Sequence, residues 1–116
     1  MTSTIKIALG LSIAAATLAI TSPASAIDFS CREASLPAER TICSDAKLAR
    51  LDETMAKIYG RLWQVSGTRA RLSLRDAQHR FLNARNDCRW NARCIHDAYL
   101  DQISVLDSKL VASLER

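Results

Sequence analysis

The four cysteines are the side chains whose type and spacing most directly predict chemistry in this chain. Cys31 and Cys43 lie 12 residues apart, and Cys88 and Cys94 lie six apart. Four cysteines in a short secreted chain usually form a disulfide framework, for which three pairings are possible. The spacing favours Cys31 with Cys43 and Cys88 with Cys94, because each pair brackets a turn between helical segments, where Cα atoms come within disulfide range.

A zinc site is the alternative use of these thiols, with His79 and His96 as further ligands. The sequence contains no C-x-x-C knuckle to support it. It also contains no glycine-rich phosphate loop, no H-E-x-x-H and no nucleophile elbow. We therefore expect a protein that is not an enzyme and has no metal or cofactor.

Three residues between the second cysteine pair are candidates for contact with a partner: Arg89, Trp90 and Arg93. Arginine and tryptophan are the side chains that most often carry binding energy at protein interfaces. The sequence leaves two interpretations of Trp90 open. It either covers the disulfide or is an exposed anchor for a partner.

Residues 1–26 have the pattern of a secretory signal peptide. Lys6 precedes an apolar stretch from Ile7 to Ile20, and Ala24-Ser25-Ala26 is a small-x-small cleavage site. That stretch is shorter than the roughly 20 residues that span a membrane. We expect cleavage near Ala26, a mature domain of residues 27–116 without a membrane anchor, and a periplasmic or secreted location.

The mature chain is mildly basic. It carries 15 of the 16 Lys and Arg and all 12 Asp and Glu, which gives a net charge of +3. Seven arginines fall between positions 69 and 93, against two aspartates. An anionic component of the cell envelope is therefore a possible partner, and a solvated helix face is the simpler interpretation. We expect no nucleic-acid partner.

Apolar residues recur at helical spacing throughout the mature chain, and strand signals are nearly absent. Pro37 begins a short helix that runs to about Cys43, with Glu39 in its first turn, and Asp45 caps the next helix, which runs to Val65. Further helices are expected over about 69–88 and from about 91 onward. The predicted fold is all-α: a small antiparallel bundle of three main helices plus a short N-terminal helix, stapled by two disulfides.

The inner faces of these helices include polar residues. Gln78 and Arg85 lie on the apolar stripe of the third helix, and buried polar groups need partners. Asp52 on the preceding helix is the candidate partner of Arg85. Tyr59 and Tyr99 are expected to pack in the core. The apolar stripes are predicted to reach Val65 and Leu114, and in the turn between the second and third helices Gly67 is expected to be left-handed, with Thr68 as a cap.

The cysteine-proline run resembles the N-terminal domain of the LprI-type lysozyme inhibitors. The first motif, C-x-x-A-S-x-P-x-E-x-x-I-C-x-D-x-x-L-x-x-L-D, spans Cys31 to Asp52. Later matches are Tyr59, Gln78, Leu82, Arg85, Cys88, Cys94, Ala98 and Tyr99. The chain departs from the family at Phe81, where the family has Trp, and at Leu36, where it often has Ser or Thr.

The resemblance implies a protein that inhibits lysozyme in the cell envelope and so protects peptidoglycan. Arg89 or Arg93 would then pair with the two carboxylates of the lysozyme cleft. Two other functions remain as alternatives. One is a periplasmic module that binds an anionic envelope component through the Arg-rich segment, and the other is a structural or stress-related protein without a ligand site.

Overall fold

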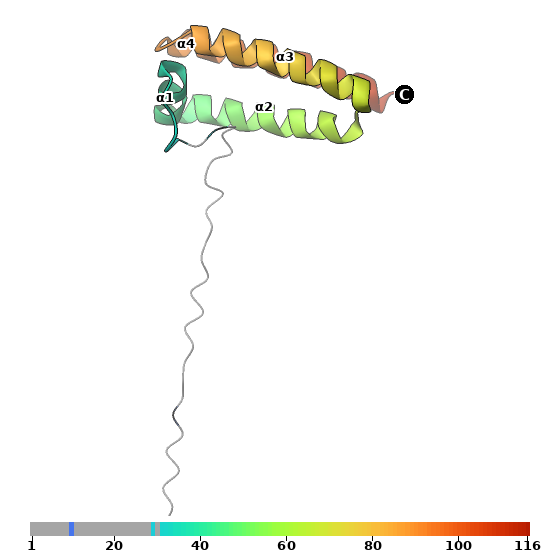
Figure 1. The fold of residues 1–116 in the computed structure, drawn as a ribbon, viewed down its shortest axis with the longest axis horizontal. Coiled ribbons are helices and arrows are strands. Elements are labelled where there is room, and N and C mark those ends of the chain that lie inside the picture. The colour runs from blue at the N-terminus through green and yellow to red at the C-terminus, as the bar shows by residue number, and fades with distance from the viewer. Residues whose placement is uncertain (1–9, 11–28, 30) are drawn as a thin grey trace, which may run out of the picture.

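The described part of the chain is entirely helical outside its turns. The computed structural model describes Gly10, Phe29 and residues 31–116, which contain no strand. Its helices are α1 (Pro37–Ser44), α2 (Ala46–Val65), α3 (Thr68–Asp87) and α4 (Ala92–Leu114). The long helix α3 runs antiparallel to α2 and α4, and α1 lies across one end of these three helices (Figure 1). The predicted small all-α bundle is confirmed. Apart from Gly10, the predicted signal peptide of residues 1–26 lies outside the described residues.

The first two helices begin where the sequence predicts. Pro37 occupies the first turn of α1, and Glu39 Oε1 accepts hydrogen bonds from the backbone N–H groups of Ser35 (3.2 Å) and Leu36 (3.1 Å). Asp45 caps α2 by accepting from the N–H groups of Lys47 (2.9 Å) and Leu48 (3.2 Å). These contacts satisfy amide donors that the first turn of a helix leaves without partners.

The turn between α2 and α3 differs from the prediction. Gly67 has φ −76° and is the N-cap of α3, and Thr68 is the first residue inside the helix rather than its cap. The left-handed conformation expected at Gly67 is therefore wrong. Because Gly67 has no side chain, α3 begins without a side-chain cap.

The core lies where α4 packs between its neighbours. The most extensive packing joins α4 to α2, with which it runs parallel, and the contact of α4 with α3 is smaller. Two residues predicted on the inner stripes are exposed instead, Val65 (56%) and Leu114 (72%), because both lie at the far ends of their helices. The buried apolar residues are Ala38, Ile42, Leu48, Met55, Leu62, Leu74, Phe81, Ile95, Tyr99 and Leu106.

Both disulfides lie at the end of the bundle that α1 crosses. Cys31 pairs with Cys43 (Cα–Cα 5.8 Å) and Cys88 pairs with Cys94 (5.5 Å), as the spacing predicts. All four thiols are thus used, which overturns the zinc alternative. Disulfides of this kind are typical of proteins outside the reducing cytosol. Among the helices that the structure describes, none has the length and apolarity to span a membrane.

We call the end formed by α1 and the turn of residues 88–94 the stapled end. The opposite end, formed by residues 66–67 and the last turns of α4, is the open end. The name reflects that no disulfide reaches it, since both pairs lie at the stapled end.

Candidate functional site

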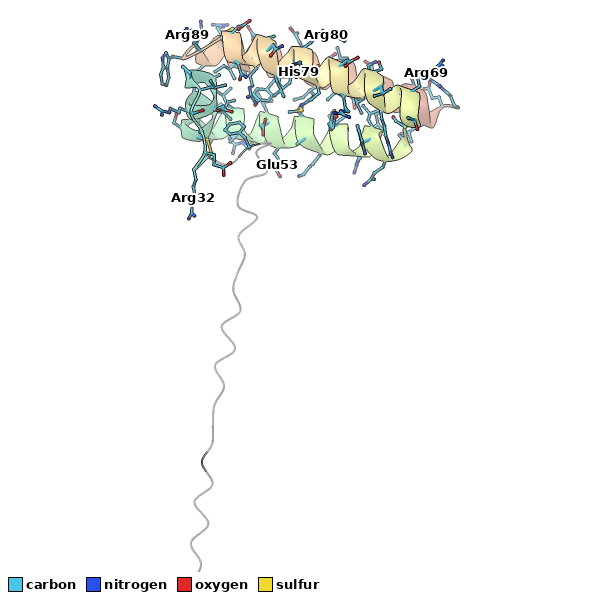
Figure 2. All side chains as sticks on the ribbon, in the orientation of Figure 1. Arg32, Glu53, Arg69, His79, Arg80 and Arg89 are labelled. Carbon is cyan, nitrogen blue, oxygen red and sulfur yellow. A yellow bond between two sulfur atoms is a disulfide. The ribbon has the colours of Figure 1, made fainter. Side chains whose placement is uncertain are left out.

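The turn of residues 88–94 presents the candidate contact residues. Trp90 is 61% exposed, and Arg89 and Arg93 are exposed beside it. Figure 2 shows Arg89 pointing away from the bundle at the stapled end. Of the two interpretations of Trp90, the structure supports the exposed one, because a lid over the disulfide would be mostly buried.

The backbone of this turn is tightly constrained. The Arg89 N–H donates to the Asn86 carbonyl (3.1 Å), and the Asn91 N–H donates to the Cys88 carbonyl (3.1 Å). Asn91 then caps α4 by accepting from the Cys94 N–H (3.0 Å). Together with the Cys88–Cys94 disulfide, these contacts fix the turn at both of its ends.

Arg89 has an unusual backbone conformation, with φ 54°. Among the described residues it is the only non-glycine residue with a positive φ. It stands just after the end of α3, where glycine is usual because a Cβ costs about 1 to 2 kcal/mol in this region. The Arg89 side chain therefore adds backbone strain at this position. No pattern in the sequence indicates this conformation.

A buried polar cluster supports the turn from below. Asp52, Arg85 and Tyr99 are at most 2% exposed. The Tyr99 hydroxyl donates to Asp52 Oδ1 (2.7 Å), and Arg85 Nη1 lies 4.0 Å from the same oxygen and donates to Tyr99 Oη (3.4 Å). The predicted pairing of Asp52 with Arg85 is confirmed. The central role of Tyr99 in the cluster is new, because its spacing predicted only core packing.

The environment of Tyr99 keeps its phenol protonated. Burial, followed by the charge of Asp52 and its hydrogen bond, raises the pKa of Tyr99 far above the usual value, and Arg85 opposes this only in part. Tyr99 therefore acts as a neutral donor to the Asp52 carboxylate. The Phe81 ring packs against it with centroids 5.2 Å apart.

Arg85 links this cluster to the turn. Its Nε and Nη2 donate to Asn86 Oδ1 (3.1 and 2.9 Å). The backbone carbonyl of Asn86 in turn accepts a hydrogen bond from the Arg89 N–H. The guanidinium also lies 5.2 Å above the Phe29 ring. The residues that match the family motif therefore build the support of the turn and leave its outer surface to Arg89, Trp90 and Arg93.

The other motif residues are structural as well. Gln102 Nε2 donates to Gln78 Oε1 (3.1 Å), and Gln78 Nε2 lies 3.2 Å from Met55 Sδ, so the inner amides are partnered. Tyr59 is half-buried and stacks on Trp63, with ring centroids 6.1 Å apart. The contacts of Gln78 with Met55 and Gln102 connect α2, α3 and α4 across the middle of the bundle.

The arginines of positions 69–93 do not form one surface. Arg85 is buried, and Arg71 donates to the Trp63 carbonyl (2.8 Å) while its guanidinium lies 5.0 Å above the Trp63 ring. Arg69 and Arg80 lie far apart on α3, and Arg89 follows that helix in the turn at the stapled end (Figure 2). The Arg-rich segment is therefore only partly available to an anionic partner.

The two histidines lie on different helices. His79 is exposed on α3, and His96 is half-buried on α4 with Nδ1 3.3 Å from Asp97 Oδ1. Within the described ranges, no group of three or more His, Cys, Asp and Glu side chains is placed to hold a metal ion.

Comparison with known proteins adds no assignment. No family model, no curated protein and no solved structure gives a significant match to this chain.

Proposed function

We propose that this protein is an exported binding module that inserts the turn of residues 88–94 into the acidic cleft of a lysozyme and so inhibits it. The observation that carries the proposal is the exposure of Trp90 between two arginines on a disulfide-closed turn. The resemblance to LprI-type inhibitors supports the choice of partner. The role is binding, without catalysis.

The composition of the turn suits a protein partner. Tryptophan and arginine dominate interface energies when they enter a pocket that excludes water. The disulfide and the backbone hydrogen bonds hold the turn in one conformation before binding, which lowers the entropy that binding costs. A rigid turn with these side chains is therefore a suitable anchor.

The charge of the turn suits a cleft with two carboxylates. Lysozyme cleaves glycosidic bonds with a pair of carboxyl groups. An arginine guanidinium binds a carboxylate through two parallel hydrogen bonds, and such pairs are strong once water is excluded. In this arrangement Arg89 or Arg93 pairs with a carboxylate while Trp90 fills the adjacent apolar part of the cleft.

The test is an inhibition assay of the mature protein, residues 27–116, against common-type, goose-type and invertebrate-type lysozymes. Arg89→Gly is the most informative variant, because it removes the cationic side chain and also relieves the positive φ of the backbone. The variant should fold at least as stably as the parent and inhibit at least tenfold less. Trp90→Ala should also weaken inhibition at least tenfold.

The matched control is Arg69→Ala with Arg80→Ala, two exposed arginines of α3 outside the turn. This control should inhibit as well as the parent. Failure of the parent to inhibit any of the three lysozymes at micromolar concentration would remove the proposal. Equal inhibition by Arg89→Gly, Trp90→Ala and the parent would exclude the turn as the contact.

A second candidate function is binding of an anionic envelope polymer through α3. The exposure of Arg69, Arg75 and Arg80 on that helix favours it. Exposed charges are screened over about 8 Å at physiological ionic strength, so this binding should weaken steeply as salt rises. Insertion of the turn into a cleft should depend far less on salt. Loss of polymer binding in Arg69→Ala with Arg80→Ala would support the second function.

A further inference from the structure

A pocket at the open end has the features of a second binding site. Its volume is about 490 Å³, and it lies between the end of α2, the start of α3 and the last turns of α4. We propose that it binds an anionic amphiphile, with one acyl chain on its apolar floor and a carboxylate or phosphate group at its cationic rim. This site is at the opposite end from the turn of residues 88–94 and does not depend on the function proposed there.

The floor of the pocket is apolar. Leu62 and Leu74 lie at its base with 4% of their surface exposed, and Val65 stands at its edge with 56% exposed. These side chains come from helices that contact each other little directly, because α4 provides most of the packing in the bundle. The wall between α2 and α3 is therefore incomplete at this end. An acyl chain would remove the remaining apolar surface from water.

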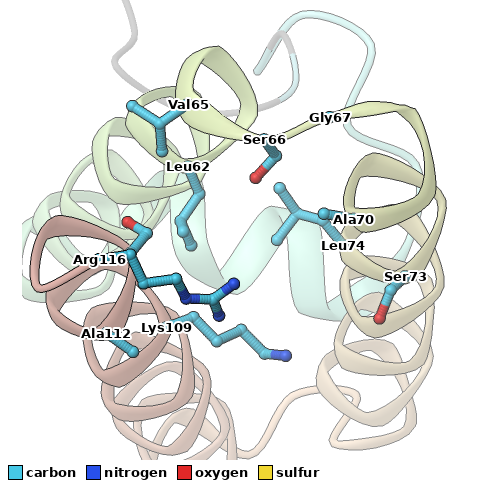
Figure 3. A pocket seen from close by; sticks show the side chains of 11 residues that line it. Leu62, Val65, Ser66, Gly67, Ala70, Ser73, Leu74, Lys109, Ala112 and Arg116 are labelled. Atoms are coloured by element: carbon cyan, nitrogen blue, oxygen red, sulfur yellow. The ribbon is translucent and has the colours of Figure 1, made fainter.

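The rim of the pocket is cationic. Lys109 from α4 and Arg116, two residues after the end of α4, extend across the opening toward α3 (Figure 3). No acidic side chain lines the pocket, and among the described residues neither cation has an ion pair. Arg85, by contrast, pairs with Asp52 inside the bundle. The two cations of the rim are thus available for an anion.

The combination selects the ligand class. A neutral apolar molecule would use the floor and leave the rim without a partner, and a small inorganic anion would use the rim and leave the floor exposed. A molecule with one anionic group and one short acyl chain uses both. The serine hydroxyls of the lining, among them Ser73, can donate further hydrogen bonds to its head group.

The test is calorimetric titration of the mature protein with decanoate and with decan-1-ol, both below their aggregation concentrations. The two ligands have the same chain length and differ in charge. Decanoate should bind at least tenfold more tightly than decan-1-ol. The double variant Lys109→Ala with Arg116→Ala should lose at least tenfold in decanoate affinity and retain its weak affinity for the alcohol.

The matched control is Lys47→Ala with Arg50→Ala, which removes the same charge from exposed positions near the other end of α2. It should leave decanoate affinity unchanged within twofold. An equal loss in both double variants would overturn the proposal, because the attraction would then come from net charge and not from the pocket.

Gly67 offers a test that leaves both cations in place. It lines the pocket and is the N-cap of α3 with an ordinary φ, and a Cβ there meets no atom within 4 Å. Gly67→Ser and Gly67→Asp should therefore both fold and cap α3. Only aspartate adds a negative charge beside the rim, so Gly67→Asp should weaken decanoate binding at least fivefold and Gly67→Ser should not. Equal affinities of the two variants would contradict the proposal.

The source of the amphiphile is distinguished with vesicles of phosphatidylglycerol and of phosphatidylcholine. Binding to decanoate without binding to either vesicle identifies a free amphiphile as the ligand. Binding to phosphatidylglycerol vesicles that Lys109→Ala with Arg116→Ala abolishes identifies a lipid head group. The proposal is overturned if millimolar decanoate does not bind and vesicle binding is absent or unchanged by that variant.

Discussion

At the stapled end two disulfides, the helix α1 and a buried ion pair hold the long helices, whereas the open end has apolar packing, a two-residue turn and the contact of Arg71 with Trp63. The stapled end contains Asp52, Tyr99 and Arg85, which are buried and contact one another. The open end contains a helix start without a side-chain cap and exposed apolar residues such as Val65 and Leu114. More kinds of interaction therefore oppose local unfolding at the stapled end than at the open end.

This difference matches what each end is proposed to do. A turn that inserts into a preformed cleft gains affinity from rigidity, since less conformational entropy is lost on binding. A pocket that takes up an acyl chain between helices benefits from walls that adjust to the chain, and regions of low local stability allow such motion. We therefore expect the stapled end to exchange its amide hydrogens more slowly than the open end.

The largest effect is expected from Asp52→Ala. The substitution leaves the Arg85 guanidinium buried without its carboxylate, and breaking a buried pair in this way costs about 3 to 5 kcal/mol. Chemical denaturation should show this loss, and hydrogen exchange should show the stapled end to be as labile as the open end. Asp107→Ala is the control, because Asp107 is exposed on α4 and its loss should change stability by about 0.5 kcal/mol or less. A loss below 1 kcal/mol for Asp52→Ala would contradict the importance of the cluster.

Removal of the disulfides separates stability from binding. Cys88→Ser with Cys94→Ser and Cys31→Ser with Cys43→Ser should each cost about 2 to 3 kcal/mol in the free energy of unfolding, as short-loop disulfides do. Only the first pair of substitutions releases the turn that carries Trp90. Lysozyme inhibition by the folded variants should therefore fall in the first and persist in the second. Equal inhibition by the two variants would show that the turn does not need its disulfide.

Much of the stapled end was predictable from local sequence patterns. Pro37, Glu39 and Asp45 determine where α1 and α2 begin, and the cysteine spacing gives the observed pairs. The pairing of Asp52 with Arg85 was predicted because Arg85 lies on the apolar stripe of its helix, needs a partner there, and has an acidic residue, Asp52, on the preceding helix. These features are predictable because each depends on the positions of a few residues within one helix or on neighbouring helices.

The features that were missed depend on the assembled bundle. The helical periodicity of Val65 and Leu114 matches the inner stripes, but the neighbouring helices end before they can cover these residues. Gly67 was expected to close α2 in the left-handed region, whereas its φ is ordinary and it opens α3 instead. The pocket of the open end depends on where the three helices end relative to one another, so no sequence motif predicts it.

An intermediate effect is expected for Tyr99→Phe. The variant removes the hydroxyl that donates to Asp52 Oδ1, so the buried carboxylate loses a hydrogen bond. This loss should lower the free energy of unfolding by about 1 to 3 kcal/mol near neutral pH. The raised pKa of Tyr99 adds a pH dependence. Above about pH 10 the unfolded chain releases the phenol proton while the folded protein retains it, so this contribution to stability is full below about pH 10 and declines above it.

The difference in stability between the parent and Tyr99→Phe should therefore shrink as pH rises above about 10. Tyr59 is present in both proteins, so its titration largely cancels in the comparison. Urea denaturation of both proteins from pH 7 to pH 11 measures the effect. A difference that stays constant over this range would mean that the Tyr99 phenol is not held in its protonated form.

The smallest effect is expected from Gly60→Ala, which strengthens α2 on the side of the open end. Gly60 lies inside α2, and a Cβ at this position meets no atom within 4 Å. Because glycine inside a helix costs roughly 0.5 to 1 kcal/mol relative to alanine, the substitution should raise the free energy of unfolding by about that amount. Hydrogen exchange should slow mainly in the last turns of α2.

Arg50→Gly makes the opposite change to Gly60→Ala, because it introduces a glycine into α2 instead of removing one. Arg50 is an exposed position of the same helix nearer the stapled end, where glycine should cost about 1 kcal/mol. If the open end is the part that opens first, Gly60→Ala slows local exchange there, whereas Arg50→Gly lowers global stability and leaves the exchange of the open end almost unchanged. Equal changes at both ends in either variant would mean that the bundle opens as one unit, because a single cooperative transition transmits a local change in stability to every amide.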